Sequence, residues 1–347
     1  MGIKPIFDSA NWGMPFHFWS VVFFVLGCLI GSFLNVVIHR LPLEQSIVSP
    51  PSHCPHCNYS IPWYLNIPLV TWLYLGGKCA NCGAPISIRY FLVELLTGVT
   101  YLMSWVAFGH DSPWLALAYC LFLSGLMAGT FIDFEHYIIP DEITIGGIVV
   151  GFLISFLVPL LHLTQNREQG LVESVKGILA GGGIIYFVLR AGKLAFGRQK
   201  LAFPGMSKVI FTETAIVLPD AEVLYEELFY RKSDTVKLEA ATAELSDRCY
   251  RDVAVRLTPS KLWIGEEEMD PAQVPYLEVQ TNRMTLPREV MGLGDVKLMA
   301  AIGAFLGWQA VVFTLMLSSI LGSVVGVALI AMKKQTPSGR LAYVPYI

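Results

Sequence analysis

Two aspartates lie at the ends of long apolar segments, where an ionisable side chain is costly unless it is paired or lines a wet cavity. Asp133 closes one apolar segment, and Asp295 stands where another begins. Two carboxyl groups that face each other across helices can share one proton, so that one acts as a base toward water while the other donates to a carbonyl oxygen. Such a pair would perform aspartic protease chemistry. Alone, either aspartate could instead cap a helix end or lie solvated in a loop.

Two glycines precede the second aspartate, in the sequence Gly292-Leu293-Gly294-Asp295. Glycine removes side-chain bulk and allows unusual backbone angles, which would let an extended peptide come close to Asp295. By itself, Gly-x-Gly-Asp is a weak pattern, and it gains weight only from the motifs that accompany it.

Four of the seven cysteines form two Cys-x-x-Cys doublets, Cys54 with Cys57 and Cys79 with Cys82. Two such turns can present four thiolates tetrahedrally to a structural Zn²⁺. The 21 residues between the doublets slightly exceed the usual spacing. We expect a zinc knuckle, with redox use and unligated thiols as the alternatives.

Two further carboxylates lie near the apolar segments. Asp141 precedes one of them, where it would cap free amides and meet the positive end of the helix dipole, and we expect this capping rather than direct catalysis. Glu94 lies about one helical turn inside another apolar segment and should face the helix bundle. Its pairing with Arg89 or Lys297 is as well supported as a contact with substrate.

The composition defines the class of protein that must position these groups. Hydrophobic residues make up 54% of the 347 residues and charged residues 15%, and the mean hydropathy is +0.56. These values predict an integral membrane protein in a lipid bilayer. The net charge of -3 leaves no basic surplus to bind a phosphate backbone, so nucleic acid is not an expected partner.

Apolar windows of about 20 residues can cross roughly 30 Å of hydrocarbon. Five windows fit: residues 18–38, 91–108, 114–132, 143–163 and 175–196. A sixth stretch, residues 296–332, is too long for one span and is broken by glycines, so it predicts two helices that meet near Trp308. The expected fold class is an all-α polytopic membrane protein with about seven spans.

Basic residues place one side of these spans in the cytoplasm. They follow the first, fifth and seventh spans, beginning with Arg40 and ending with Lys333 and Lys334. Both aspartates and the cysteine loop, residues 39–90, then face the cytoplasm, where disulfides are disfavoured. Residues 1–17 would form a periplasmic N-terminus, on the side opposite the cytoplasm, and residues 333–347 would form a cytoplasmic tail.

A polar block interrupts the apolar pattern between residues 197 and 290, which include 12 of the 24 basic and 16 of the 27 acidic residues. Apolar and polar residues alternate in residues 208–218, 235–238 and 253–263, which indicates short strands. We expect a small β-rich cytoplasmic module, with a partly ordered loop as the alternative.

These motifs together resemble those of the bacterial type IV prepilin peptidases. The matching segments are residues 31–42, the two cysteine doublets, Arg89-Tyr90 with Val93-Glu94, Ile132-Asp133 leading to Ile139-Pro140-Asp141, and residues 292–298. Their order and spacing also agree. The resemblance covers nearly everything except the polar block and the extreme N-terminus.

The resemblance implies a membrane-embedded aspartic endopeptidase of the bacterial inner membrane. Such an enzyme removes the short basic leader of prepilins or pseudopilins, after a glycine and at the cytoplasmic face, in type IV pilus and type II secretion systems. It then methylates the new amino terminus with S-adenosylmethionine, whose site we would place first in the loop that contains residues 31–42 and the cysteines. By position, Asp133 and Asp295 match the catalytic pair.

The remaining matched residues would support this pair. They are Asp141, Gly292, Gly294, Lys297 and Glu94. Two departures stand out. The resemblance implies that the polar block of residues 197–290 is an insertion, and it leads us to expect a last hydrophobic helix beyond residue 347, so that the sequence would stop before a final span.

Two rival classes make other predictions. A proton-coupled transporter would show inverted repeats and discontinuous helices near the membrane midplane, and the sequence shows neither. A zinc-anchored scaffold without chemistry of its own would leave the positions of Asp133 and Asp295 unexplained.

Overall fold

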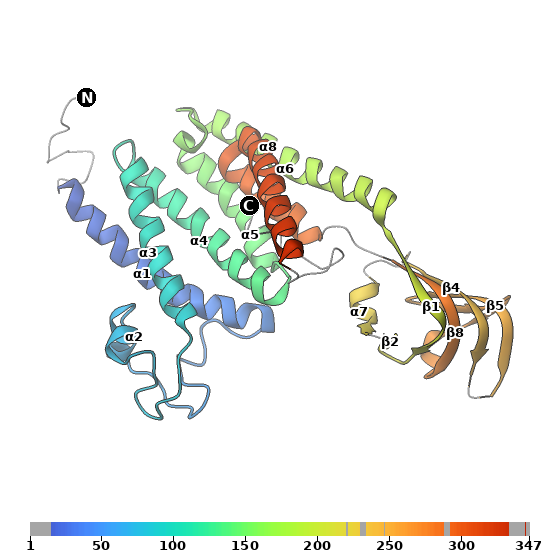
Figure 1. The fold of residues 1–347 in the computed structure, drawn as a ribbon. Coiled ribbons are helices and arrows are strands. Elements are labelled where there is room, and N and C mark those ends of the chain that lie inside the picture. The colour runs from blue at the N-terminus through green and yellow to red at the C-terminus, as the bar shows by residue number, and fades with distance from the viewer. Residues whose placement is uncertain are drawn as a thin grey trace. The chain divides into compact units, whose positions relative to one another are not determined.

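The computed structural model describes residues 15–219, 221–229, 234–245, 247–287, 292–332 and 344. The chain divides into two compact units (Figure 1). The helical unit comprises Met1–Ile185 and Leu293–Ile347, and the β unit comprises Tyr186–Gly292. The predicted outer N-terminus and cytoplasmic tail lie almost entirely outside the described residues.

Long apolar helices dominate the first unit. The helices are α1 (Phe16–Arg40), α2 (Val70–Tyr74), α3 (Ile88–Phe108), α4 (Pro113–His136), α5 (Asp141–Leu157), α6 (Arg167–Phe196), whose last turns belong to the β unit, and α8 (Leu293–Ala331). Short 3₁₀ turns are η2 (Leu41–Leu43), η3 (Trp63–Leu65) and η4 (Pro159–His162).

Five of the described helices are long and apolar enough to cross a membrane, which agrees with a membrane protein. They are α1, α3, α4, α6 and α8. The expected count of about seven is not confirmed, because α5 has only 17 residues and α8 runs on without a connecting loop. The predicted break near Trp308 is present as a kink inside α8, where Gly307 has non-helical angles of φ 79° and ψ 175°.

Glycines allow the helices of this unit to approach closely, as they do in many membrane proteins. A Cβ added at Gly177 of α6 would overlap the carbonyl group of Gly303 in α8. On α1, a Cβ at Gly27 would lie 2.7 Å from the Thr97 carbonyl oxygen of α3. Backbone therefore packs on backbone at both contacts.

The kink of α8 is supported by hydroxyl groups from two other helices. Ser155 Oγ of α5 and Ser174 Oγ of α6 donate hydrogen bonds to the Ala304 carbonyl oxygen, at 3.1 and 2.9 Å. Both serines are buried. An apolar interior offers few other donors to a backbone acceptor, so these bonds stabilise the turn that precedes Gly307.

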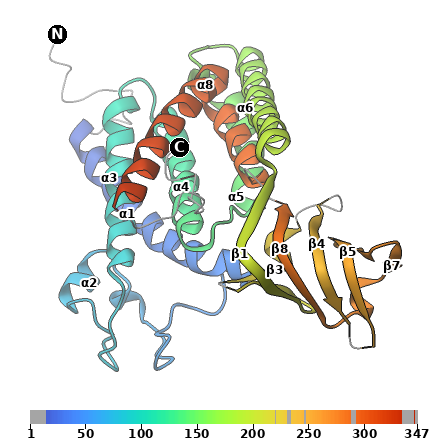
Figure 2. The same cartoon turned by 45° about the vertical axis from the view of Figure 1, so that its right-hand side comes forward.

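An antiparallel sheet forms most of the second unit (Figure 2). Its strands, in the order β3-β2-β1-β8-β4-β5-β6-β7, are β1 (Arg198–Phe211), β2 (Ala215–Val217), β3 (Glu222–Leu224), β4 (Val236–Glu244), β5 (Cys249–Thr258), β6 (Lys261–Ile264), β7 (Glu267–Met269) and β8 (Leu277–Pro287). The short helices α7 (Tyr225–Leu228) and η5 (Pro271–Gln273) complete the described part.

Alternating apolar residues give the sheet its own core. Val209 pairs with Val279, and Leu238 with Met284, and all four side chains are buried. Because successive residues of a strand point to opposite faces, this register puts the apolar side chains of neighbouring strands on one face. The prediction of a β-rich insertion is confirmed.

Candidate active site and metal centre

Asp133 and Asp295 lie at opposite ends of their helices. Asp133 belongs to the last turn of α4, which ends where Tyr137 adopts the left-handed conformation (φ 54°) and donates its amide to the Asp133 carbonyl oxygen at 3.0 Å. Asp295 belongs to the first turn of α8. Both side chains are buried, with relative exposures of 7% and 9%.

Contacts on either side of Asp295 bring the start of α8 to the connection between α4 and α5. A Cβ added at Gly294 would lie 3.3 Å from the Cβ of Ile139. Lys297 Nζ lies 2.6 Å from Asp141 Oδ1. Ile139 and Asp141 follow Asp133 by only six and eight positions. The two aspartates therefore lie in the same neighbourhood, at the same end of the bundle.

Gly294 also has a role in packing. A Cβ at this position would meet Ile139, so the missing side chain lets α8 approach the α4–α5 connection. A larger residue at this position would push against Ile139.

A main-chain amide reaches the first aspartate from a distant part of the sequence. The amide of Val344 donates a hydrogen bond to Asp133 Oδ2 at 3.0 Å. Val344 is buried, with 2% of its surface exposed. Val344 belongs to the segment that we expected to be a cytoplasmic tail, and nothing in a single sequence connects it to Asp133.

Asp141 is not the cap that we expected. The N-cap position of α5 is Pro140, which makes no side-chain cap bond, and Asp141 is the first residue of the helix itself. Its carboxylate pairs with Lys297, and both side chains are largely exposed, at 59% and 37%. The negative charge still lies near the positive end of the helix dipole.

Glu94 makes neither of the pairings that we expected. Lys297 is bound to Asp141, and Arg89 forms an ion pair with Glu135. Glu94 is buried in α3, and its Oε2 accepts a hydrogen bond from the Leu69 amide at 2.8 Å. It therefore fastens the loop that precedes α3 to that helix.

The four doublet cysteines come together in one cluster. The Sγ atoms of Cys54, Cys57, Cys79 and Cys82 all lie within 4.8 Å of one another. Cys54 Sγ is 3.8 Å from Cys82 Sγ, and Cys57 Sγ is 4.0 Å from Cys79 Sγ. Tetrahedral bonds of about 2.3 Å to one zinc ion would separate the sulfurs by about 3.8 Å, so the cluster fits a metal ion.

Each doublet folds into the same kind of turn. The amides of Asn58 and Gly83 donate to the carbonyl oxygens of Cys54 and Cys79, at 2.9 and 3.0 Å. Both donors have positive φ, 53° and 71°, a conformation that asparagine and glycine adopt more readily than other residues.

Backbone amides of these turns also favour thiolates. The amides of Cys82 and Asn81 lower the pKa of the Cys79 thiol to about 6. The Asn81 side chain and the Tyr59 amide lower the pKa of Cys57. Hydrogen bonds to sulfur stabilise its charged form, which is the form that binds metal ions.

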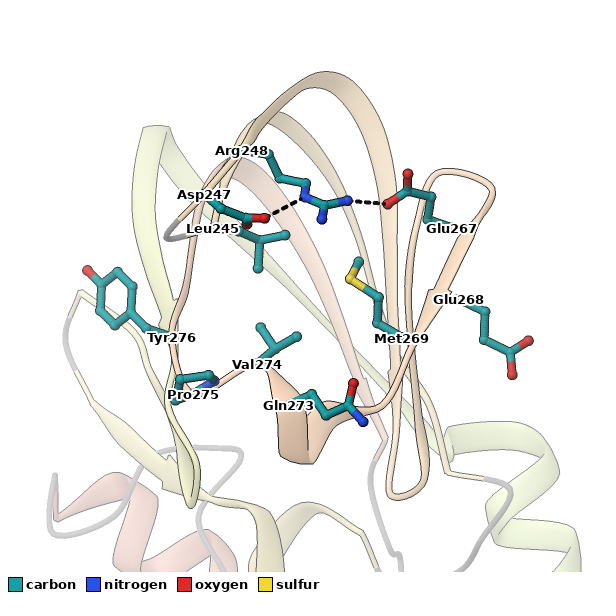
Figure 3. A pocket seen from close by; sticks show the side chains of 10 residues that line it. All are labelled: Leu245, Asp247, Arg248, Glu267, Glu268, Met269, Gln273, Val274, Pro275 and Tyr276. Carbon is teal, nitrogen blue, oxygen red and sulfur yellow. Dashed lines mark hydrogen bonds and ion pairs between the residues drawn. The ribbon is translucent and has the colours of Figure 1, made fainter.

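A hollow of about 570 Å³ lies in the β unit, and charged side chains are part of its lining, unlike the thiols of the cysteine cluster (Figure 3). Arg248 lies between Asp247 and Glu267, with N–O distances of 3.0 and 3.3 Å. Glu268 pairs with Lys261. Each of these charged side chains takes part in an exposed ion pair, so the lining differs from the buried carboxyl groups of the helical unit.

Family models match most of the chain. The model described as "Bacterial Peptidase A24 N-terminal domain" matches residues 25–108. The model described as "Type IV leader peptidase family" matches residues 120–207 and 274–327. The interval between these last two segments falls within the β unit.

Relatives named prepilin leader peptidase/N-methyltransferase are similar to this chain. The protein of Dichelobacter nodosus is 35% identical over 212 residues, which are 52% of this chain and 70% of the relative. The protein of Aeromonas hydrophila is 29% identical, over 96% of this chain and 89% of the relative. That of Myxococcus xanthus is 46% identical over 138 residues, 40% of this chain and 41% of the relative. No solved structure matches.

Proposed function

The chain belongs to the type IV leader peptidase family, and from this premise we propose that it cleaves the leader of prepilins and N-methylates the new amino terminus. The substrates and both activities are those that the names of its relatives state. The observation that carries the peptidase activity is the neighbourhood of Asp133 and Asp295, two buried carboxyl groups at one end of the helical unit.

In this proposal the two aspartates share one proton and hold a water molecule between them. The ionised carboxyl group takes a proton from the water as it attacks the scissile carbonyl, and the protonated group donates to the carbonyl oxygen. An apolar surrounding strengthens both interactions, because little water competes for the carboxylates. Asp295, in the first turn of α8, is in addition close to the positive end of that helix.

Neighbouring groups position this pair without touching the reacting atoms. The Val344 amide holds one oxygen of Asp133, and the pair of Lys297 with Asp141 holds the start of α8 against α5. Gly292 is the remaining glycine of the motif, and it would allow an extended peptide to pass beside Asp295. We assign these residues to positioning.

The site would lie at the cytoplasmic face of a bacterial inner membrane. Basic residues support this orientation, because they concentrate in the loops on the side of both aspartates. A prepilin that is inserted in the same membrane would then present its leader junction to the pair.

The cysteine cluster would hold Zn²⁺ as a structural ion. Four thiolates complete a tetrahedral shell and leave no position open for substrate, so the ion would stabilise the loop between α1 and α3 rather than take part in hydrolysis. The short distances among the four Sγ atoms support this assignment.

S-adenosylmethionine would supply the methyl group that the new amino terminus receives. Asn35, in the segment where we expected the methyl donor, has a buried Oδ1 that accepts no hydrogen bond from the residues the structure describes. Its Nδ2 donates to the carbonyl oxygens of Tyr90 and Gly31. A free buried acceptor suits an ammonium or adenine amino group of the methyl donor.

Mass spectrometry of a prepilin that is co-expressed with this chain tests both activities. We expect the leader to be lost and the mature protein to gain the mass of one methyl group. An intact leader in the presence of well-expressed enzyme would contradict the peptidase activity, and an unmethylated mature pilin would contradict the methyltransferase activity.

A further inference from the structure

The stretch between the two cysteine doublets has its only charged side chain at its last residue, Lys78. Residues 58–77 include no Asp, Glu, Lys or Arg. Within them lie η3 and the short helix α2. Six large side chains of this stretch are exposed, and we call them the aromatic loop surface: Trp63, Tyr64, Ile67, Val70, Leu73 and Tyr74. Trp63 and Tyr74 are more than four-fifths exposed, at 81% and 82%.

Two contacts fix this stretch at a definite level of α3. The Leu69 amide donates to Glu94 Oε2 at 2.8 Å, and the ring of Trp72 lies 5.2 Å from the ring of Phe91. Glu94 follows the first residue of α3 by six positions, which is about 9 Å along a helix axis. The inner face of α2 therefore lies within about two turns of the end of this membrane-crossing helix.

Leu69, whose amide contacts Glu94, has an unfavourable backbone conformation. Leu69 has φ 60° and ψ -49°, and the Val70 amide donates to the Pro68 carbonyl oxygen at 2.6 Å. These values describe a γ-turn of the strained kind. Such strain persists only where surrounding contacts stabilise the conformation. Here the hydrogen bond from the Leu69 amide to the buried Glu94 carboxylate stabilises it.

We propose that residues 58–77 are an interfacial membrane segment, whose aromatic loop surface lies at the boundary between the headgroups and acyl chains of the bilayer that α3 crosses. Tryptophan and tyrosine favour this boundary, because their rings are apolar and their N–H or O–H groups remain near water. Interfacial segments typically enter the membrane by about 5–10 Å, a distance similar to the separation of about 9 Å between Glu94 and the first residue of α3 along the helix axis.

The cysteine cluster would then have a second role. Cys57 precedes the stretch directly and Cys79 follows it after Lys78, so the cluster closes the base of a loop whose tip enters the membrane. The slightly long interval between the doublets then has a reason, since it includes the residues that reach the lipid.

Fluorescence quenching in lipid nanodiscs tests the proposal on the full chain. Subtracting the emission of a Trp63→Phe variant from that of the original protein isolates Trp63. The matched control is Trp263→Phe in the β unit, where Trp263 lies beside Lys261. Each difference is measured with lipids brominated near the headgroup end of their acyl chains, and separately with aqueous iodide. The metal content of each variant shows whether the cysteine loop is folded.

The proposal predicts that brominated lipid removes about half or more of the Trp63 emission and that iodide leaves it unchanged. Trp263 should show the opposite response. Quenching of Trp63 by iodide alone would place the surface in water and overturn the proposal. Resistance to both quenchers would mean that protein covers it, such as a second copy of the chain, and would overturn the proposal equally. Should Trp63→Phe lose its metal, a Tyr74→Trp variant adds a reporter at the neighbouring exposed position and must meet the same criteria.

Discussion

Most of the described ion pairs of the β unit lie on its surface, whereas the two aspartates of the candidate active site are buried in the helical unit. Arg248 and Glu267 are each about half exposed, and the aspartates retain less than a tenth of their exposure. Exposed pairs contribute roughly 0–1 kcal/mol to stability. The exposed pairs of the β unit therefore contribute little to stability, whereas the buried aspartates of the helical unit are placed where a carboxyl pair could do chemistry.

The cysteines of the two units also differ in their surroundings. Cys249 is exposed on the β unit and stands alone, whereas four cysteines of the helical unit share one cluster. A residue type becomes informative through the partners that the fold gathers around it.

The largest effect should come from breaking the cysteine cluster. A Cys54→Ser variant should lose its bound zinc, since a structural site of this kind supplies about 10 kcal/mol or more of apparent binding free energy. Cys249→Ser is the control and should keep the metal. Metal analysis of the two purified variants decides the matter, and equal zinc in both would refute the four-cysteine site.

Substitution of either candidate catalytic aspartate should have the next largest effect. Asp133→Asn and Asp295→Asn keep size and hydrogen bonding, and each should slow leader cleavage by about 100-fold or more, because each removes a proton-transfer group. Glu267→Gln in the β unit should leave the rate unchanged. Rates are measured with purified enzyme and a prepilin substrate. If Glu267→Gln reduced the rate of cleavage as much as either aspartate variant, the proposed difference between the two units would be wrong.

The amide of Val344 offers a smaller perturbation of the same site. Val344→Pro removes the donor to Asp133 Oδ2, and a hydrogen bond to a charged group is worth about 1.5–3 kcal/mol, so cleavage should slow by roughly 10- to 100-fold. Val344→Ala keeps the amide and should remain close to the original rate. If alanine and proline reduce the rate alike, the side chain and not the amide matters.

Asp141→Asn should have the smallest effect. Its pair with Lys297 is exposed and resembles the surface pairs of the β unit, so its loss should cost less than about 1 kcal/mol, or a few-fold in rate. Abolished cleavage in this variant, with normal expression, would move Asp141 from positioning into the catalytic set.

Local pattern was enough to predict several features. Hydropathy located α1, α3 and α4 to within a few residues, because a continuous apolar segment of this length is typical of a helix that crosses a membrane. The spacing of the cysteines predicted their cluster, and glycines predicted the break in α8. The alternation of residues 208–218 and 253–263 indicated strands, which the sheet of the β unit contains.

Side-chain partners were the part that the sequence did not reveal. Arg89 could pair with Glu94 or Glu135, and only the packing of α3 against α4 selects Glu135. Glu94 accepts an amide from Leu69, a bond that depends on a strained turn. Val344 reaches Asp133 across 211 positions of the chain. Each contact is set by the assembled fold, so no local pattern encodes it.

Asp133 and Asp295 should act as one unit in cleavage, and a double-variant cycle measures whether they do. Cleavage is measured in single turnover for Asp133→Asn, Asp295→Asn and the variant that carries both. Residues that share one proton lose their function together, so the double variant should be no slower than the slower single variant. Multiplied losses in the double variant would show that the two aspartates act independently and would contradict the account.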